Sequence, residues 1–228
     1  MQTDRGREHQ GPEGQEKHQP FPIPSRIPIF ALPSVVLFPK TYLPLHIFEP
    51  RYRQMVDDAV VSGQCVGMAL LREGWEAGYY GNPPIYSMGC VGRLVSVQPL
   101  ADGRSNILLQ GLERFEVMEE SYDRAYRQAN IELKPKQQSR LDQALRQHLV
   151  SALEDYLHTL DQPPTWQSWF REDVSDDILV NTLSTYLDCT ALEKQFLLEA
   201  DNLHQQARRL CDLIHFLLHD RHGAKGWG

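Results

Sequence analysis

The spacing of apolar residues changes near residue 135 of this 228-residue chain. Before that point, short apolar segments are separated by proline, glycine and small polar residues, which is typical of strands. After it, apolar residues recur at the three- and four-residue spacing of amphipathic helices. The pattern therefore predicts an α+β protein in which a β-rich part precedes a helical bundle.

The β-rich part opens with two predicted strands, Ile27 to Leu32 and Tyr42 to Phe48, which are joined by a proline-containing loop. Because proline removes a backbone donor, we expect both to be short edge-type strands. Straight after them, apolar residues at helical spacing predict one inserted helix that begins at Pro50 and ends near Ser62.

The loop between these two strands carries four consecutive apolar residues, from Val35 to Phe38. A surface loop of this kind either plugs the protein's own core or exposes an adhesive patch. We expect Phe38 to be mainly structural. Val36 is the better candidate for contact with a partner, because a β-branched side chain at a loop tip gains little from the core.

The next apolar run, Cys65 to Leu71, does not alternate, which predicts a strand covered on both faces. A long loop with Tyr79 and Tyr80 follows, and its aromatic side chains either grip a ligand or cap the end of a barrel. Two further β-ribbons, between residues 89 and 133, bring the expected number of strands to six or seven. Because an open sheet leaves its edges exposed, we expect a closed or half-closed β structure.

The second part is predicted to contain three or four helices. Ser139 and Ser175 are the expected N-caps of the first two helices, and Thr190 with Glu193 forms the pattern of a capping box. A hydrophobic connector that contains Trp166 lies between the first two helices.

Four segments follow from these patterns: a disordered leader at residues 1–24, a β-rich subdomain at 25–135, a helical subdomain at 136–221 and a flexible tail at 222–228. The leader has almost nothing to bury, so it cannot offset the entropy lost on ordering.

Charge and hydropathy narrow the class of protein. The formal net charge of −7 argues against a nucleic-acid binder, which needs a basic surface to displace phosphate counterions. No stretch approaches the roughly 20 apolar residues that span a bilayer, and the amino terminus does not resemble a secretory signal. We therefore expect a cytoplasmic protein without membrane or nucleic-acid partners.

Cysteine and histidine patterns do not predict a metal site. None of the four cysteines belongs to a C-x-x-C pair, so we expect reduced thiols in the core. His215 and His219 have the i, i+4 spacing of two metal ligands, but a third ligand is not evident.

Catalytic patterns are equally weak. We expect His46 to be a hydrogen-bonded core residue of its apolar strand. Asp57-Asp58 and Asp176-Asp177 are adjacent pairs whose side chains diverge by about 100° on a helix, so neither pair can share a proton as a catalytic dyad would. We expect both pairs to lie on solvent-exposed helix faces.

Several motifs with fixed spacings resemble one known family. The chain contains P-I-F-A-L-P…V-V-L-F-P…L-P-L-H-I-F-E-P-R-Y-R-Q-M, then Gly89-Cys90-Val91-Gly92 and Gly111-Leu112-Glu113-Arg114-Phe115. This combination resembles the amino-terminal, substrate-binding domain of Lon-type ATP-dependent proteases, a module also found in cereblon and in stand-alone bacterial Lon-domain proteins. The resemblance covers about Arg26 to Leu218. It departs at Lys40, where the family usually has glycine, so a left-handed backbone is less accessible and the loop tip is expected to differ.

The resemblance implies a PUA-like β pseudo-barrel with one inserted helix, followed by a helical bundle. It also implies non-enzymatic recognition of unfolded or hydrophobic polypeptide segments. The chain contains no G-x-x-x-x-G-K-[ST] loop, and its length is used up before an ATPase or a serine-lysine peptidase could begin. We therefore expect no enzymatic activity, no cofactor and no metal.

The expected partners are unfolded or partly folded polypeptides, and a separate protease is a further candidate partner. An RNA-binding PUA-like module, an adaptor that regulates a separate ATP-dependent protease, and a hydrolase remain alternatives. The first rests on fold analogy alone, and the sequence lacks a nucleophile–base pair for the last.

The expected binding surface is a groove between barrel and bundle, where a partner would bury apolar side chains and use free strand-edge hydrogen bonds. The candidate substrate-binding residues are Val36, Phe38, Leu43, Tyr79, Tyr80 and Trp166. The family-motif residues are Phe48, Glu49, Arg51, Tyr52, Arg114 and Phe115. We expect the motif residues to be structural, as an aromatic anchor and paired charges that hold the helix to the sheet.

Overall fold

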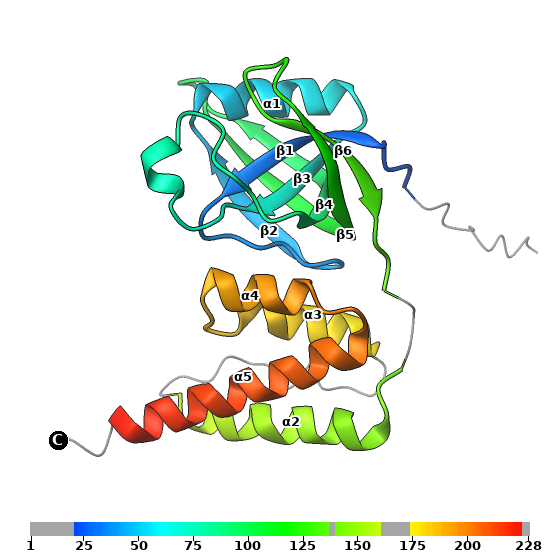
Figure 1. The fold of residues 1–228 in the computed structure, drawn as a ribbon, viewed down its shortest axis with the longest axis vertical. Coiled ribbons are helices and arrows are strands. Elements are labelled where there is room, and N and C mark those ends of the chain that lie inside the picture. Colours follow the sequence, from blue (N-terminus) through cyan, green and yellow to red (C-terminus); the bar gives the residue numbers. More distant parts are fainter. Residues whose placement is uncertain (1–20, 137–139, 161–173, 225–228) are drawn as a thin grey trace, which may run out of the picture.

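The computed structural model describes residues 21–136, 140–160 and 174–224. Figure 1 shows two stacked parts, a curled sheet with one helix on top and a group of four helices below. The strands are β1 (Arg26–Leu32), β2 (Tyr42–Ile47), β3 (Cys65–Leu70), β4 (Met88–Pro99), β5 (Ser105–Ser121) and β6 (Gln128–Leu133). The helices are α1 (Pro50–Val61), the 3₁₀ helix η1 (Trp75–Gly78), α2 (Gln143–His158), α3 (Asp176–Tyr186), α4 (Ala191–Leu198) and α5 (Leu203–Ala224). The predicted α+β class with a pseudo-barrel is confirmed.

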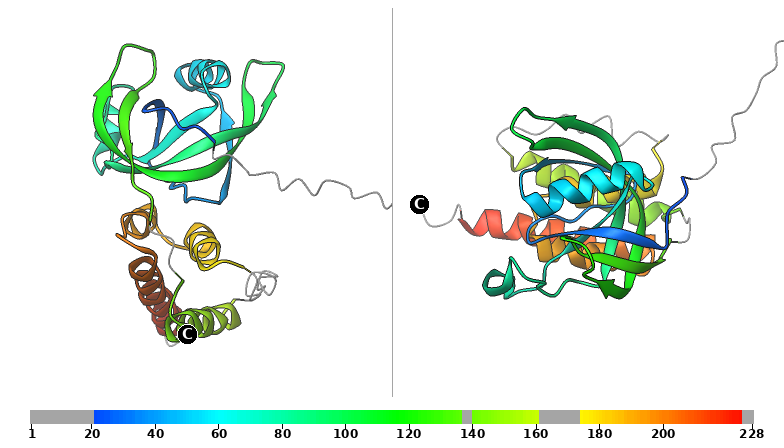
Figure 2. Two further views of the ribbon diagram at one scale, coloured as in Figure 1. Left: turned by 90° about the vertical axis from the view of Figure 1, so that its right-hand side faces the viewer. Right: turned by 90° about the horizontal axis from the view of Figure 1, so that it is seen from above.

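The sheet closes on itself because β5 takes part in both ends of it. The strand order is β2-β5-β4-β3-β1-β6, and β6 also pairs with β5, so five strands form a ring and β2 is attached outside it. The two ribbons that we predicted separately share the single 17-residue strand β5. Figure 2 shows the ends of the long strands rising as two arms beside α1.

The prediction of two edge strands is wrong for β1. This strand lies inside the sheet, parallel to β3 and antiparallel to β6, and of the strands in the described residues only β2 lies at an edge. The proline of β1, Pro28, is opposite Gln128 near the end of the β6 ladder, and the ladder continues through Ile29, whose N–H donates to the Arg127 carbonyl at 2.8 Å. One proline at the start of a strand therefore does not keep it at the edge. As predicted, β3 is buried on both faces.

The loop between β1 and β2 lies directly on β5. The Lys40 N–H donates to the Gly111 carbonyl at 2.7 Å, and the Gly111 N–H donates to the Thr41 carbonyl at 2.8 Å. A Cβ at Gly111 would overlap the carbonyl oxygen of Phe38, so only glycine permits this approach. Lys40 adopts the left-handed conformation with φ of 63°, so lysine does not prevent that backbone here, and a loop tip that differs from the family's stays a prediction.

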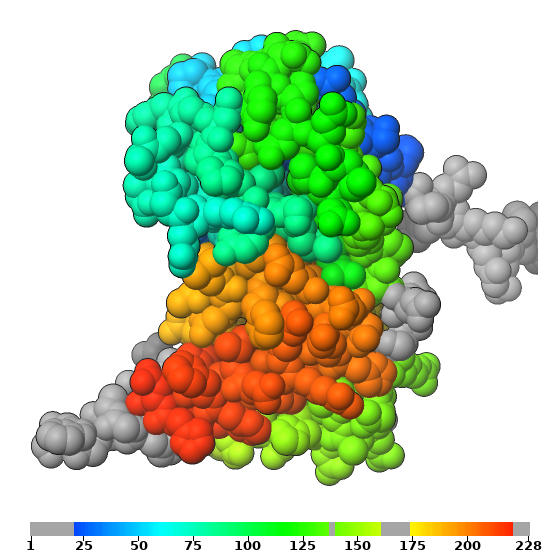
Figure 3. Space-filling view, viewed as in Figure 1, coloured from blue at the N-terminus to red at the C-terminus, as the bar shows by residue number. Residues whose placement is uncertain are grey.

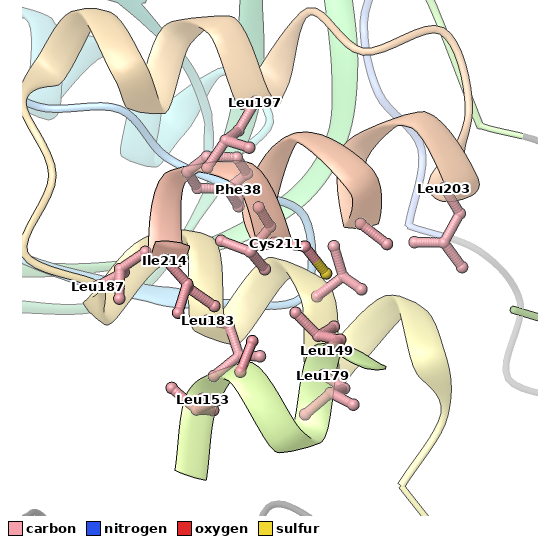
Figure 4. Packing of buried hydrophobic residues seen from close by; sticks show 14 of the residues in the cluster. Phe38, Leu149, Leu153, Leu179, Leu183, Leu187, Leu197, Leu203, Cys211 and Ile214 are labelled. Carbon is pink, nitrogen blue, oxygen red and sulfur yellow. The ribbon is translucent and has the colours of Figure 1, made fainter. Parts of the chain in front are cut away.

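This loop joins the two parts of the molecule. Leu37 packs into the barrel core, whereas Val36 and Phe38 pack into the core of the helical bundle. Phe38 is completely buried, and Figure 4 shows it among side chains of the bundle that include Leu197 and Ile214. The plug interpretation is confirmed, but the core that Phe38 fills is that of the bundle rather than that of the barrel.

The helices cover the barrel with α4 and α3 next to it, and α2 and α5 lie farther away (Figure 1). Figure 3 shows the α4 region in direct contact with the barrel surface. The capping box is confirmed, since the Glu193 N–H donates to Thr190 Oγ1 at 3.2 Å and the Thr190 N–H donates to Glu193 Oε2 at 2.7 Å. The cap of α2 is Asp142, whose carboxylate accepts from the Leu145 N–H. Ser139, the predicted cap, lies outside the described residues.

The ends of the described chain correct two predicted boundaries. Phe21 and Ile23, which we placed in the disordered leader, pack against the barrel core, and the guanidinium of Arg93 lies 4.4 Å from the ring centroid of Phe21. At the other end, α5 continues to Ala224, so residues 222–224 are helical rather than part of a tail. The division between subdomains near residue 135 stays a prediction.

Candidate functional site

A cavity of about 760 Å³ lies where the barrel, the linker and the bundle meet. We call it the junction cavity. It is lined by Pro39, Lys40, Leu112, Glu113, Arg114, Lys136, Arg140, Leu141, Gln143, Arg146, Val174, Ser175, Asp176, Asp177, Asn181, Leu203 and Gln206. Apolar and polar residues both contribute, as in sites that bind a ligand by burial and orient it by a few polar groups.

Arg114 fixes the barrel to the bundle at this cavity. The residue is 5% exposed, and its Nη1 donates to the carbonyl oxygens of Leu198 at 2.9 Å and Ala200 at 2.8 Å. The Leu198 carbonyl is at the C-terminal end of α4 and the Ala200 carbonyl lies just after it, where the helix dipole favours a cation. Its Nε is buried and has no hydrogen-bond partner among the described residues. Burial lowers the pKa of the guanidinium from its ordinary value.

Lys136 reaches the same cavity from the linker that follows β6. Its Nζ donates to Gln206 Oε1 at 2.5 Å, and Gln206 is itself completely buried. The Gln206 Nε2 donates to Asn181 Oδ1 and Ser184 Oγ, both at 3.1 Å, which fixes the direction of the Gln206 carbonyl. Burial lowers the pKa of Lys136 to about 7, and the nearby guanidinium of Arg114 acts in the same direction.

Acidic residues at the start of α3 close one side of the cavity. Asp177 forms an ion pair with Lys40 of the β1–β2 loop. Asp176 accepts from the Leu141 N–H at 2.9 Å and from Arg146 Nη1 at 3.2 Å. The expectation that this aspartate pair lies on a solvent face is therefore wrong. The same holds for Asp58 of α1, which accepts from the Tyr126 hydroxyl at 2.7 Å.

A second, smaller pocket of about 250 Å³ lies on the barrel between α1, the aromatic loop and the β5–β6 turn. We call it the barrel-end pocket. Its cations are Arg51, Arg124 and Arg127, and its aromatic side chains are Tyr52, Tyr79, Tyr80, Tyr122 and Tyr126. Each arginine meets a carboxylate: Arg51–Glu49 at 3.0 Å, Arg124–Asp58 at 3.5 Å and Arg127–Glu120 at 3.1 Å.

The family-motif residues of α1 build one side of this pocket. The Tyr79 hydroxyl donates to Glu49 Oε1 at 2.5 Å, and the guanidinium of Arg51 lies between the rings of Tyr52 and Tyr79. The Tyr52 hydroxyl donates to the Ala31 carbonyl at 3.0 Å, and burial raises its pKa to about 12. The paired charges therefore hold α1 mainly to the aromatic loop. Among the aromatic motif residues Tyr52 and Phe115 are buried as an anchor requires, whereas Phe48 is 60% exposed.

The other candidate substrate-binding residues do not converge on one site. Val36 and Phe38 are covered by the helices, and Leu43 is partly buried against the barrel core. Tyr79 is held by Glu49 at the barrel-end pocket, whereas Tyr80 is 92% exposed beside it. Their assignment to substrate binding stays a prediction. Trp166 lies outside the described residues.

Phe115, the last family-motif residue, is completely buried in the barrel core. Its ring lies so close to Gly67 and Gly89 that a Cβ at either glycine would crowd it. This packing explains why a glycine belongs to the motif at residue 89, on the neighbouring strand β4.

His46 lies on the outer face of β2, not in the core as expected. Its Nδ1 is 2.8 Å from Asn106 Oδ1, and its exposure follows from the strict alternation of β2. Within the described residues, no three His, Cys, Asp or Glu side chains come together to hold a metal ion. The four cysteines are free thiols, and three of them are buried.

Sequence reasoning missed Lys136 and its hydrogen-bonded partner Gln206. One signal was present, because Gln206 occupies the apolar stripe of α5 defined by Leu203, Ala207 and Leu210. A polar residue on such a stripe needs a buried partner. Lys136 itself carries no comparable signal, since a lysine in a linker is ordinary.

Comparison with known proteins gives a consistent result. Residues 26–215 match the model of the "ATP-dependent protease La (LON) substrate-binding domain". The Lon protease of Flavobacterium johnsoniae is 26% identical over 202 residues, covering 86% of this chain and 24% of the relative. That of Parabacteroides distasonis is 28% identical over 209 residues, covering 89% and 24%. The chain thus spans about a quarter of the length of these relatives.

Two solved structures share the fold. The Lon N-terminal domain protein from Xanthomonas campestris aligns with a TM-score of 0.61 and 22% identity, covering 84% of this chain and 98% of that one. The N-terminal domain of the Mycobacterium avium complex Lon protease aligns with a TM-score of 0.62 and 18% identity, covering 83% and 98%. None of the helices in the described part of the chain is long and apolar enough to cross a membrane. The chain belongs to the family of Lon protease substrate-binding domains.

Proposed function

We propose that this domain binds unfolded or partly folded polypeptides without cleaving them, and that the junction cavity is where it does so. The observation that supports this most directly is a cavity of about 760 Å³ at the meeting point of barrel and bundle, in a member of the Lon substrate-binding family. Apolar lining from Leu112, Leu141 and Leu203 suits an apolar side chain of the partner. The cavity lies between barrel and bundle, like the groove that the sequence predicts, but none of the predicted substrate-binding residues that the structure describes is part of its lining.

The remaining contacts are proposed from the sequence and the edge of the sheet. β2 is the one strand outside the ring in the described structure, and an extended peptide could pair with such an edge. Leu43 and Tyr42 lie on this strand, with Tyr42 50% exposed. Pro44 interrupts the row of donors on β2, so we assign the cavity the larger share of the affinity.

The binding site is tested by blocking the mouth of the cavity. Gln143 is an exposed residue at the start of α2 and lines the cavity, so Gln143→Trp should obstruct it without disturbing a core. Gln147→Trp, one turn later on α2 and outside the lining, is the matched control. With reduced, carboxymethylated casein as the probe, the first variant should weaken capture at least about fivefold, equivalent to about 1 kcal/mol, and the second less than twofold. Equal capture by both variants and the parent would remove the cavity from the proposal.

The absence of catalysis is tested separately. The purified chain should neither bind nor hydrolyse ATP, and it should leave casein intact, because the sequence contains neither a phosphate loop nor a serine-lysine pair in recognisable form. Nucleotide-dependent cleavage that follows the chain through purification and disappears with a point substitution in it would contradict this.

A further inference from the structure

The junction cavity contains two cationic groups that form no ion pair with any described residue, although Glu113 and Asp201 lie near enough to raise their pKa values. Arg114 and Lys136 both line it, and in the described parts of the chain neither forms an ion pair. Lys40 and Arg146 differ, since Lys40 is paired with Asp177 and Arg146 with Asp176, whereas Arg140 and Glu113 are further charged residues of the lining. A buried charge without a counterion is costly, so this pair of cations needs an explanation.

We propose that Arg114 and Lys136 form a subsite for a carboxylate of the bound polypeptide, either an acidic side chain or the C-terminal carboxylate. This inference rests on the proposed function and adds the chemistry that the cavity recognises. A carboxylate accepts a hydrogen bond from Lys136 and supplies, next to both groups, the ion-pair partner that the described residues do not provide.

The hydrogen bonds around the two cations leave donors for such a ligand. The Nη1 of Arg114 is anchored by the carbonyls of Leu198 and Ala200, and its Nε is a buried donor without a partner among the described residues, so a ligand contacts the guanidinium mainly through its charge. Lys136 has three donor positions, of which the structure uses one, toward Gln206. Both anchors are rigid, because the α4 carbonyls and the buried Gln206 belong to packed helices.

Apolar side chains in the same cavity allow the rest of a peptide to bind beside its carboxylate. Leu112 precedes Arg114 by two residues on β5, and Leu203 precedes Gln206 by three on α5. An apolar residue next to an acidic group, or at the end of a chain, therefore matches the cavity better than a purely charged segment.

Binding is expected to depend on pH through Lys136. The charged groups that face it are Arg114 and Glu113 from β5, Asp201 before α5, and Arg209 within α5. Since burial holds the Lys136 pKa near 7, a bound carboxylate raises that pKa and the complex takes up a proton at neutral pH. Affinity should therefore fall about tenfold between pH 6.5 and pH 8.5, a range in which peptide carboxylates stay ionised.

The experiment uses two pairs of N-acetylated pentapeptides rich in leucine and phenylalanine, titrated calorimetrically into the full chain. One pair differs only in a free or amidated C-terminus. The other pair is amidated and differs only in a central glutamate or glutamine. At least one acidic member should bind about tenfold more tightly than its neutral counterpart at pH 6.5. Preference within only the first pair identifies the chain end as the ligand, and preference within only the second identifies a side chain.

Three variants separate charge from structure. Lys136→Gln should abolish the preference for the acidic peptide, whereas Lys136→Arg should keep it and lose the pH dependence, because arginine stays protonated throughout. Lys134→Gln is the matched control, since Lys134 lies on the same linker but pairs with Glu116 and Glu132. It should behave like the parent. Lys136 is preferred to Arg114 for this test because Arg114 also holds α4 in place.

Two results would overturn the carboxylate subsite. If acidic and neutral peptides bind equally while casein is still captured, the subsite is wrong and the proposed function stands. If casein and all four peptides fail to bind, the proposed function fails and the subsite with it.

Discussion

The barrel-end pocket and the junction cavity are both lined by cationic side chains, but they differ in whether these cations have carboxylate partners. In the barrel-end pocket each arginine meets a carboxylate, and the aromatic rings fill the space between them. In the junction cavity, among the described residues, Arg114 and Lys136 have only neutral oxygen partners. Cations that are all paired with carboxylates stabilise the structure, whereas cations without such partners can pair with a charged ligand. Cationic lining alone therefore does not distinguish a binding site from a structural one.

The largest expected effect concerns the plug beside the junction cavity. Phe38→Ala removes a completely buried ring and should lower the free energy of unfolding by about 3 to 5 kcal/mol. Chemical denaturation of both proteins measures the difference. Phe48→Ala, which removes an exposed phenylalanine after β2, is the control and should change stability by less than about 0.5 kcal/mol. If Phe38→Ala unfolds like the parent, the loop does not join barrel to bundle as described.

The second prediction tests whether the barrel-end pocket is structural. The side chain of Arg127 is 6% exposed, pairs with Glu120 and donates through Nη2 to the Pro83 carbonyl at 2.6 Å. Arg127→Met should cost about 2 to 3 kcal/mol of stability because it leaves buried acceptors without a donor. Casein capture by the folded fraction should stay within twofold of the parent. A loss of capture without a loss of stability would instead make this pocket the binding site.

The third prediction concerns the uncompensated lysine. A lysine in the unfolded chain titrates near pH 10.4, whereas in the folded chain Lys136 has a pKa of about 7. Between these values the unfolded state holds a proton that the folded state lacks, so the free energy of unfolding rises as pH rises. We expect a gain of about 1 to 2 kcal/mol from pH 7 to pH 9, after allowing for the partial exposure of this side chain. Lys136→Met removes this titrating group and leaves the others. The part of the rise in the free energy of unfolding between pH 7 and pH 9 that comes from Lys136 should therefore be absent in this variant.

The smallest effect is expected at Tyr80, which is 92% exposed at the barrel-end pocket. Tyr80→Ala should change stability by less than about 0.5 kcal/mol. Because we interpret the barrel-end pocket as structural rather than as a binding site, casein capture should also change less than twofold. A clear loss of capture, by about 1 kcal/mol or more, would restore the predicted role of the aromatic loop in substrate binding.

Much of the fold could be predicted from apolar periodicity. The order of strand, loop, strand and helix at the start, the fully buried β3 and the capping box of α4 all depend on neighbours within a few residues. The glycines of the motif at residues 89 and 111 are visible in the sequence, but their reason is tertiary, since they allow close packing against Phe115 and the β1–β2 loop. The local features follow from backbone sterics and side-chain spacing, which a sequence records directly.

The candidate site could not be predicted in the same way. The sequence determined that the chain has a β-rich part, a helical part and a buried-loop candidate at Phe38. Only the tertiary structure decided that Phe38 enters the bundle, that Asp176 and Asp177 face inward, and that Lys136 meets Gln206 across 70 residues. The reason is physical: the balance of charges in a cavity depends on which distant side chains the fold brings together and removes from water. A linker lysine has the same local sequence whether it ends in solvent or in a cavity.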